Sequence, residues 1–245
     1  MTEFARFATA ITRTPLFQLE FAACYGVLVK TLDLSNVGGR ENNVNHAMVA
    51  HVLTFCPNLE CIDLSLCRNI SDAQFIRLFA DNPHISRKLK SLNLDKISIG
   101  DEAMGQTVCL LPNLIHLRLS ETNAGPLTCI AIGSCLFDLR SLGIASCDLI
   151  DDSCLVAVAK GCKKLRHIKI KGCSNIQTDD AEDLMALHRC FPYVSDGSDN
   201  EYDDDTGTII DDIANDPLLH MFFGNGEHSV RSINELVYSA MDTSD

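Results

Sequence analysis

The sequence predicts an α/β solenoid, an arc of short parallel strands with helices on its outer side. Three apolar positions, the second and third following the first by three and five residues, recur along the chain. This frame begins at six places: Val29, Leu59, Leu89, Leu114, Leu139 and Leu165. The steps between them are 30, 30, 25, 25 and 26 residues. Such regular spacing indicates a stack of similar units and not one globular core.

Each copy of the frame predicts one strand. The second and third apolar positions are two residues apart, so on a strand their side chains point to one face while the flanking residues point to the other. A single strand cannot bury such an apolar face, but neighbouring copies in a stack can cover it. The frame and its period are those of a leucine-rich repeat, and we expect about six to seven repeats within residues 29–194.

Helices are expected between the strands. Four segments have helical periodicity: 71–82, 100–111, 151–162 and 178–190. Most of them open on Ser, Thr, Asp or Gly followed by acidic residues, which suits the free amides and the positive end of a helix start. Gly161 and Pro192 are helix-ending residues near two of the carboxyl ends. Each unit is therefore strand, turn, helix and return.

The two ends of the chain differ from the repeats in composition. Of the 33 acidic and 20 basic residues, 13 acidic residues and one basic residue lie in 195–245, so this end holds almost all of the net charge of −13. We expect an N-terminal capping segment at 1–28, an acidic flexible loop at 195–216 and a C-terminal capping segment at 217–245. Arg6 and Arg13 also resemble a mitochondrial presequence, but Glu3 favours the capping segment. No apolar run reaches the roughly 18 residues of a membrane helix.

Twelve cysteines are scattered through the predicted strands and helices. Without a secretion signal, we expect them to be reduced thiols of an intracellular protein, in the cytoplasm or the nucleus. No C-x-x-C pair occurs, so we expect neither a metal site nor another cofactor. Cys67, Cys147 and Cys173 occupy the ninth position of their repeats, where a small buried thiol can donate a hydrogen bond to the turn after the strand.

The pattern of cysteines resembles that of a known repeat family. Three features carry the resemblance: cysteine at the ninth position, cysteine three residues before the first leucine (Cys56, Cys162), and the segments NISDAQF, LIDDSCL and NIQTDD. They are similar to the cysteine-containing leucine-rich repeats of F-box substrate receptors and antagonist-of-mitotic-exit proteins, over residues 24–194. The resemblance implies an adaptor, regulator or substrate receptor in ubiquitin-ligase or cell-cycle control. No F-box is recognisable in residues 1–28, so we expect no conventional docking on the cullin-ligase adaptor.

The sequence contains no familiar catalytic motif. A nucleophile elbow, a phosphate-binding P-loop, an H-E-x-x-H pair and a strand-linked dinucleotide motif are all missing. The acidic stretch from Asp196 does not fit a calcium-binding loop, because Glu201 stands where glycine is needed and Gly207 where the bidentate glutamate belongs. We therefore expect that the chain is not an enzyme.

The candidate site is the polar side of the predicted strands. Residues that flank the second and third apolar positions should point to the concave inner wall of the arc, where we expect a protein partner to bind. Their charges change from acidic to basic along the stack, and independent solvation would not sort the signs in this way. The predicted partner-binding residues are Asp33, Asp63, Asn93, Asp95, His116, Arg118, His167, Lys169 and Lys171.

Two further expectations concern charge. The basic residues within 160–171 allow an alternative function, a leucine-rich-repeat protein associated with nucleic-acid repair, although the net charge of −13 and the few aromatic residues disfavour nucleic acid. Residues 196–212 either cover the basic end of the inner wall and compete with an acidic partner, or serve as a solvating linker. In the first case, phosphorylation of Ser198 would strengthen the binding of this segment to the basic end. The sequence does not predict an oligomeric state.

Overall fold

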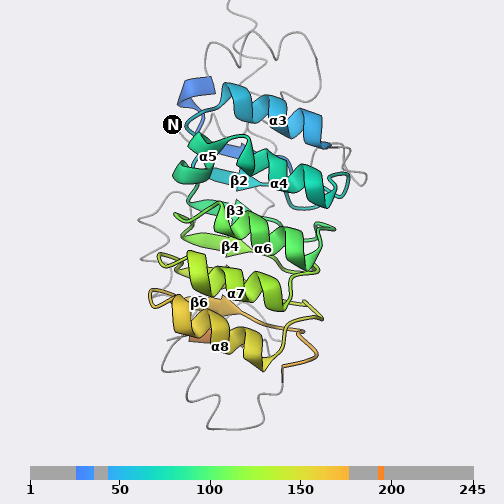
Figure 1. The fold of residues 1–245 in the computed structure, drawn as a ribbon, viewed down its shortest axis with the longest axis vertical. Coiled ribbons are helices and arrows are strands. Elements are labelled where there is room, and N and C mark those ends of the chain that lie inside the picture. Colours follow the sequence, from blue (N-terminus) through green and yellow to red (C-terminus); the bar gives the residue numbers. More distant parts are fainter. Residues whose placement is uncertain (1–25, 36–43, 177–192, 196–245) are drawn as a thin grey trace, which may run out of the picture. The chain divides into compact units, whose positions relative to one another are not determined.

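The structure, a computed structural model, describes residues 26–35, 44–176 and 193–195 (Figure 1). The chain divides into two compact units, residues 1–197 and 198–245, and every described residue belongs to the first unit. Strands and helices alternate along it. In order, the elements are η2 (Gly26–Leu28), β1 (Thr31–Asp33), α3 (His46–Phe55), β2 (Cys61–Asp63), α4 (Asp72–Ala80), α5 (Pro83–Lys88), β3 (Ser91–Asn93), α6 (Asp101–Cys109), β4 (His116–Arg118), α7 (Pro126–Cys135), β5 (Ser141–Gly143), α8 (Asp152–Gly161), β6 (His167–Lys169) and β7 (Tyr193–Ser195).

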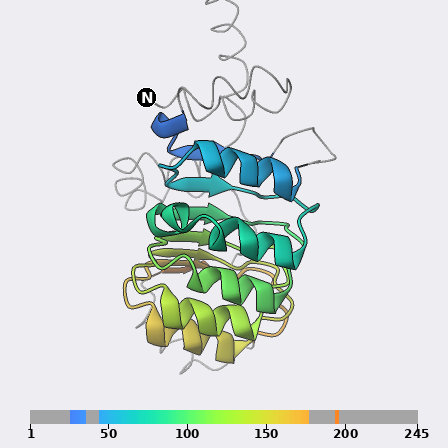
Figure 2. The ribbon, with the colours of Figure 1, turned by 45° about the horizontal axis from the view of Figure 1, so that its top comes forward.

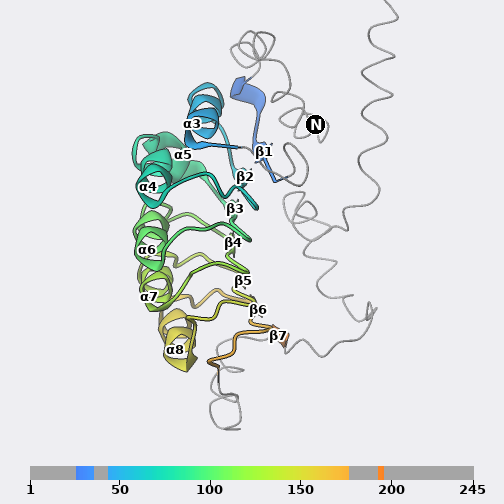
Figure 3. The same ribbon diagram turned by 90° about the vertical axis from the view of Figure 1, so that its right-hand side faces the viewer.

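The seven strands form one parallel sheet in chain order, from β1 to β7. Each strand pairs with the next in the register of the repeat, so that Leu32, Ile62 and Leu92 lie side by side. The described helices α3 to α8 lie together on one side of this sheet (Figure 3). The predicted α/β solenoid of leucine-rich repeats is therefore confirmed: strand, turn and helix recur with each copy of the apolar frame.

The apolar frame forms the core. Leu59, Ile62 and Leu64 have no exposed surface, and the corresponding residues of the following repeats are also buried. Phe75 and Phe79 of α4 complete the core on the helix side, with their rings edge to face and the centroids 5.6 Å apart. Full burial of one such side chain contributes about 1.5 to 3 kcal/mol. Because this core lies between repeats, each repeat is stabilised by its neighbours.

Three of the four predicted helical segments are helices in the structure. Helices α4, α6 and α8 lie within the expected segments 71–82, 100–111 and 151–162, and the short helix α5 follows α4. The fourth segment, 178–190, lies outside the described residues. Helix α3 supplies the helix expected in the first unit but was not among the four named segments; the side chain of Asn45 caps it by accepting a hydrogen bond from the Met48 amide (3.1 Å).

Helix α7 was not among the four expected segments either, because the residue that caps its start lies in another repeat. The helix begins at Pro126 and contains no charged residue, so its sequence has no acidic first turn. The carboxylate of Asp101, at the start of α6, instead accepts hydrogen bonds from the amides of Gly125 (2.8 Å), Leu127 (3.0 Å) and Thr128 (2.9 Å). A cap supplied from a distant residue cannot be found by inspecting the helix sequence alone.

Helices α6, α7 and α8 pack side by side along the stack (Figures 1 and 2). A Cβ at Gly133 of α7 would lie 2.3 Å from the carbonyl oxygen of Ala157 in α8. A Cβ at Gly161 of α8 would lie only 1.7 Å from the carbonyl oxygen of Gly133. The backbones of α7 and α8 therefore meet here, and no side chain fits between them.

A left-handed turn follows five of the strands. The eighth position of the repeat has a positive φ at Leu66 (66°), Lys96 (63°), Glu121 (57°), Ser146 (54°) and Gly172 (76°). Only the last is glycine. Side chains at the other four positions carry a strain on the order of 1 to 2 kcal/mol each.

The ninth position, directly after this turn, links adjacent repeats. The thiol of Cys147 donates to the carbonyl oxygen of Leu119 (3.1 Å), and the thiol of Cys173 donates to that of Ile144 (3.0 Å). Both acceptors are the third apolar position of the preceding repeat. The ninth-position cysteines are thus buried hydrogen-bond donors as predicted, but these acceptors belong to the preceding repeat and not to the turn after the cysteine's own strand.

Candidate functional site: the strand face

The predicted site residues lie in columns across the sheet. We call the side chains that flank the second and third apolar positions of β1 to β6 the strand face. The pairing of the strands aligns one column from Asp33 on β1 through Asp63, Asn93, Arg118 and Gly143 to Lys169 on β6. His116 and His167 belong to the column of first strand residues, whereas Asp95 and Lys171 follow their strands. The change from acidic to basic along the stack is therefore an arrangement in space.

At the acidic end, each polar side chain closes the turn after its own strand. The Oδ1 atom accepts a hydrogen bond from the backbone amide two residues further along the chain, which is a turn typical of Asp and Asn. The pairs are Asp33 with Ser35 (2.9 Å), Asp63 with Ser65 (2.8 Å) and Asn93 with Asp95 (3.1 Å). These residues therefore have a structural role besides any role in binding.

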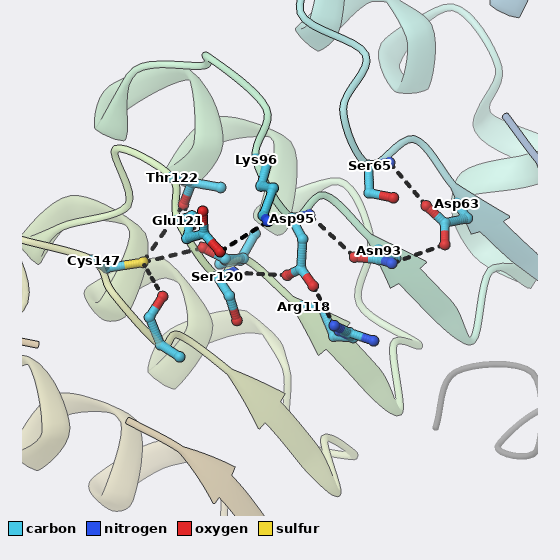
Figure 4. Close-up of polar contacts among 12 residues, drawn as sticks. Asp63, Ser65, Asn93, Asp95, Lys96, Arg118, Ser120, Glu121, Thr122 and Cys147 are labelled. Carbon is cyan, nitrogen blue, oxygen red and sulfur yellow. Dashed lines mark hydrogen bonds and ion pairs between the residues drawn. The ribbon is translucent and has the colours of Figure 1, made fainter. Parts of the chain in front are cut away.

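A polar network connects β2, β3 and β4 (Figure 4). The side-chain amide of Asn93 donates to Oδ2 of Asp63 (2.8 Å). The carboxylate of Asp95 accepts a hydrogen bond from the amide of Ser120 (2.8 Å) and forms an ion pair with the guanidinium of Arg118. The positive charge of Arg118 is thus balanced within the sheet.

Burial divides the strand face into a covered middle and more open ends. Only 6% of the surface of Asn93, 7% of Asp95 and 6% of His116 is exposed. The sequence alone predicted that these residues would face an open wall. Neighbouring strands lie only about 4.8 Å apart, so in-register neighbours cover much of a short polar side chain. Lys169 and Lys171, at the end of the stack, are exposed.

The acidic end has an unusual electrostatic environment. Burial raises the pKa of Asp63 above its ordinary value, and the neighbouring Asp33 carboxylate raises it further. Hydrogen bonds from Ser65 and Asn93 oppose this rise in the pKa. Since Asp33 and Asp63 are in-register partners, a cationic group placed over both would relieve their repulsion.

Three remaining points concern a metal site, a membrane helix and the acidic segment. No group of three His, Cys, Asp or Glu side chains in residues 26–35 and 44–176 could hold a metal ion. No helix in the described part of the chain is long and apolar enough to cross a membrane. Ser198 and the acidic segment 196–212 lie outside the described residues.

The ion pair between Asp95 and Arg118 was missed at the sequence level. A usable signal was present, because Asp95 lies just beyond a strand whose last residue, Asn93, aligns with Arg118 in the repeat frame. Comparing opposite charges between adjacent copies of the frame would have predicted the contact. From the sequence, Arg118 was instead expected to contact a protein partner.

Comparison with known proteins gives the fold and little more. No protein-family model matches the sequence, and no curated protein matches it. Among solved structures, the chain is similar to a chain of the Rad7 and Elc1 complex in yeast, with a TM-score of 0.51 and 19% sequence identity. The match covers 68% of this chain and 47% of that chain, which is less than half of its length. This likeness supports the leucine-rich-repeat architecture.

Proposed function

We propose that this chain is a noncatalytic protein-interaction module, an adaptor or substrate receptor in ubiquitin-ligase or cell-cycle control, acting in the cytoplasm or nucleus. The observation that carries the proposal is the separation of charge on the strand face, with Asp33 and Asp63 at one end and Lys169 and Lys171 at the other. A partner with the opposite order of charges would bind in one orientation, since like charges brought together cost several kcal/mol.

The polar network of β2 to β4, which begins beside the acidic end at Asp63, supports this function indirectly. Asp63, Asn93, Asp95 and Arg118 are joined by hydrogen bonds and an ion pair across three strands. Such a network fixes the side chains before a partner arrives, which lowers the entropy lost on binding. Substitutions in the network would therefore disturb the platform, and the binding test is better made at the two ends.

Capture of partners from cells tests the proposal. The bait is the tagged 245-residue chain, compared with Asp33→Asn and with the double variant Lys169→Glu/Lys171→Glu. Asp33→Asn keeps the oxygen that accepts from Ser35 and removes only the charge. We expect both variants to lose the partners of the parent chain by about tenfold, with unchanged thermal unfolding.

Two charge-reversal variants on the helix side of the molecule serve as matched controls. Glu102→Lys on α6 and Lys160→Glu on α8 change exposed charges away from the sheet. They should retain the partners. If the helix-side reversals abolish capture while the strand-face variants bind normally, the strand face is not the binding site.

The nucleic-acid alternative relies on the basic residues within 160–171, and at least two of these already have protein partners. Lys164 forms an ion pair with Asp138, and the Lys163 ammonium donates to the carbonyl oxygen of Ala159 (3.1 Å). Binding of a duplex DNA at several salt concentrations separates the two functions. If the affinity for DNA falls steeply with salt concentration and depends on Lys169 and Lys171, the result favours the nucleic-acid function over the protein-interaction function.

A further inference from the structure

Two thiols from neighbouring repeats are in contact on the helix side of the molecule. Cys109 is the last residue of α6, and Cys135 is the last residue of α7. Their sulfur atoms are 2.6 Å apart, although the residues are 26 positions apart in the sequence. A disulfide bond is about 2.05 Å long, so the two sulfurs need to approach by less than about 1 Å to bond.

Exposure distinguishes this pair from the other described cysteines. Cys109 is exposed and Cys135 is partly exposed, whereas the remaining eight of the ten described cysteines are buried. Oxidation of thiols depends on access to the oxidant. Within the described part of the chain, a water-borne oxidant therefore meets Cys109 first and finds Cys135 beside it.

We propose that Cys109 and Cys135 are a redox modification site, at which an oxidant of the peroxide class forms a reversible disulfide between α6 and α7. In the first step, the Cys109 thiolate attacks a peroxide oxygen, so that an S–O bond forms, the O–O bond breaks and hydroxide leaves. In the second step, the Cys135 sulfur displaces hydroxide from the sulfenic acid and loses its proton. Two thiols and one hydrogen peroxide thus become one disulfide and two waters, and a dithiol reductant reverses the change.

The two cysteines have different roles. Cys109 is the member that the oxidant reaches. Burial and the neighbouring Cys109 thiol raise the pKa of Cys135, which suits Cys135 to the second step, the attack on the sulfenic acid. The close packing around Gly105 in α6, where a Cβ would lie 3.1 Å from the carbonyl oxygen of Leu127 in α7, keeps the two helices in place. The disulfide therefore forms with little movement of the backbone.

Peptide mapping after oxidation tests the proposal on the whole chain. The reduced protein is treated with hydrogen peroxide, free thiols are alkylated, and the protein is digested with trypsin. Cleavage after Lys96, Arg118 and Arg140 separates the two cysteines into peptides 97–118 and 119–140. We expect the linked pair of peptides, fragment ions that assign the bond to Cys135 and not to Cys129, and loss of the link after reduction. The oxidised protein should also melt roughly 5 °C or more above the reduced protein.

A transposed thiol is the matched control. The double variant Ser134→Cys/Cys135→Ser keeps the number of cysteines but moves the thiol by one residue around α7, at an exposed position. In this variant, the amount of peptide linked to Cys109 should be lower by about tenfold or more, because a disulfide requires a specific geometry. Cys109→Ser should abolish both the linked peptides and the rise in melting temperature. Equal linkage in the transposed variant, or a Cys109 in the parent chain that is oxidised to sulfinic acid without a link, would overturn the proposal.

Discussion

The left-handed turn after five of the strands, β2 to β6, shows how the fold tolerates strain at single residues. Leu66, Lys96, Glu121 and Ser146 adopt a φ that favours glycine, and each amide donates to a carbonyl oxygen of the next repeat. Ser146 donates to Lys171 at 2.7 Å, for example. These hydrogen bonds between repeats offset the strain, and they require a turn at this position whichever residue occupies it.

Removing this strain should stabilise the protein. We expect Ser146→Gly to raise the free energy of unfolding by about 0.5 to 1 kcal/mol, because glycine adopts a positive φ without the clash of a Cβ. The matched control is Ser134→Gly in the last turn of α7, an exposed helical position where glycine should lower stability by about 0.5 kcal/mol. Urea unfolding measures both changes, and a loss of stability in Ser146→Gly would contradict the strain argument.

At the scale of elements, the helices are connected by their caps as well as by packing. Asp101 belongs to α6, yet it binds three amides at the start of α7, and its Oδ1 also accepts from the hydroxyl of Thr128 (2.6 Å). Asp72 at the start of α4 accepts in the same way from the amide of Gly100, which precedes α6 (3.1 Å). An acidic residue in the first turn of one helix thus stabilises the start of the next.

Loss of this cap should therefore affect a helix to which the residue does not belong. We expect Asp101→Ala to lower the free energy of unfolding by about 2 kcal/mol, at the upper end of the range for a lost cap, because several donors lose their acceptor. Hydrogen exchange should speed up at the start of α7 more than in α6. Glu102→Ala, at the adjacent exposed position, should change stability by less than about 0.5 kcal/mol. Faster exchange confined to α6 would contradict the prediction.

The strands could be predicted from the sequence, whereas some of the helices could not. Two apolar residues at a spacing of two determine a strand locally, and the repeat of this pattern determines its partners. Helix α7 has only a weak local signal, Pro126 at its first position, because Asp101 caps it from the preceding repeat and its exposed face carries apolar residues such as Leu127 and Ile130. The candidate site could also be predicted only in part. The repeat of the apolar frame predicts which strand-face residues align across the sheet, but the burial of Asn93 and His116 depends on side chains of neighbouring strands.

At the scale of the whole molecule, the core contains many protonated thiols. Burial raises the pKa of Cys56 and of Cys162 to about 11, and burial also raises the pKa of Cys129, Cys147 and Cys173. In the unfolded chain, a thiol titrates near 8.5. Between these two values, the unfolded state loses protons that the folded state keeps, so stability falls as the pH rises.

Stability should consequently decline at alkaline pH even when the thiols are kept reduced. Between pH 8 and pH 10, we expect Cys56 and Cys162 each to lower the free energy of unfolding by on the order of 1 to 2 kcal/mol. Urea unfolding at several pH values, with reductant present, measures the slope. Cys162→Ala should start from a lower stability at pH 7 and show a shallower slope; an unchanged slope would mean that this thiol does not contribute.

The contact between Gly133 and Gly161 also sets how strongly the stack bends. Adjacent strands are about 4.8 Å apart, whereas packed helices usually lie about 8 to 10 Å apart, and this difference curves a solenoid toward its strands. Because the backbones of α7 and α8 touch at these glycines, we expect a smaller difference and a gentler curvature at this point of the stack. The distance between the acidic and basic ends of the strand face therefore depends on two glycines, Gly133 and Gly161, on the helix side of the sheet. A partner that spans both ends would have to match a curvature set by residues that it never contacts.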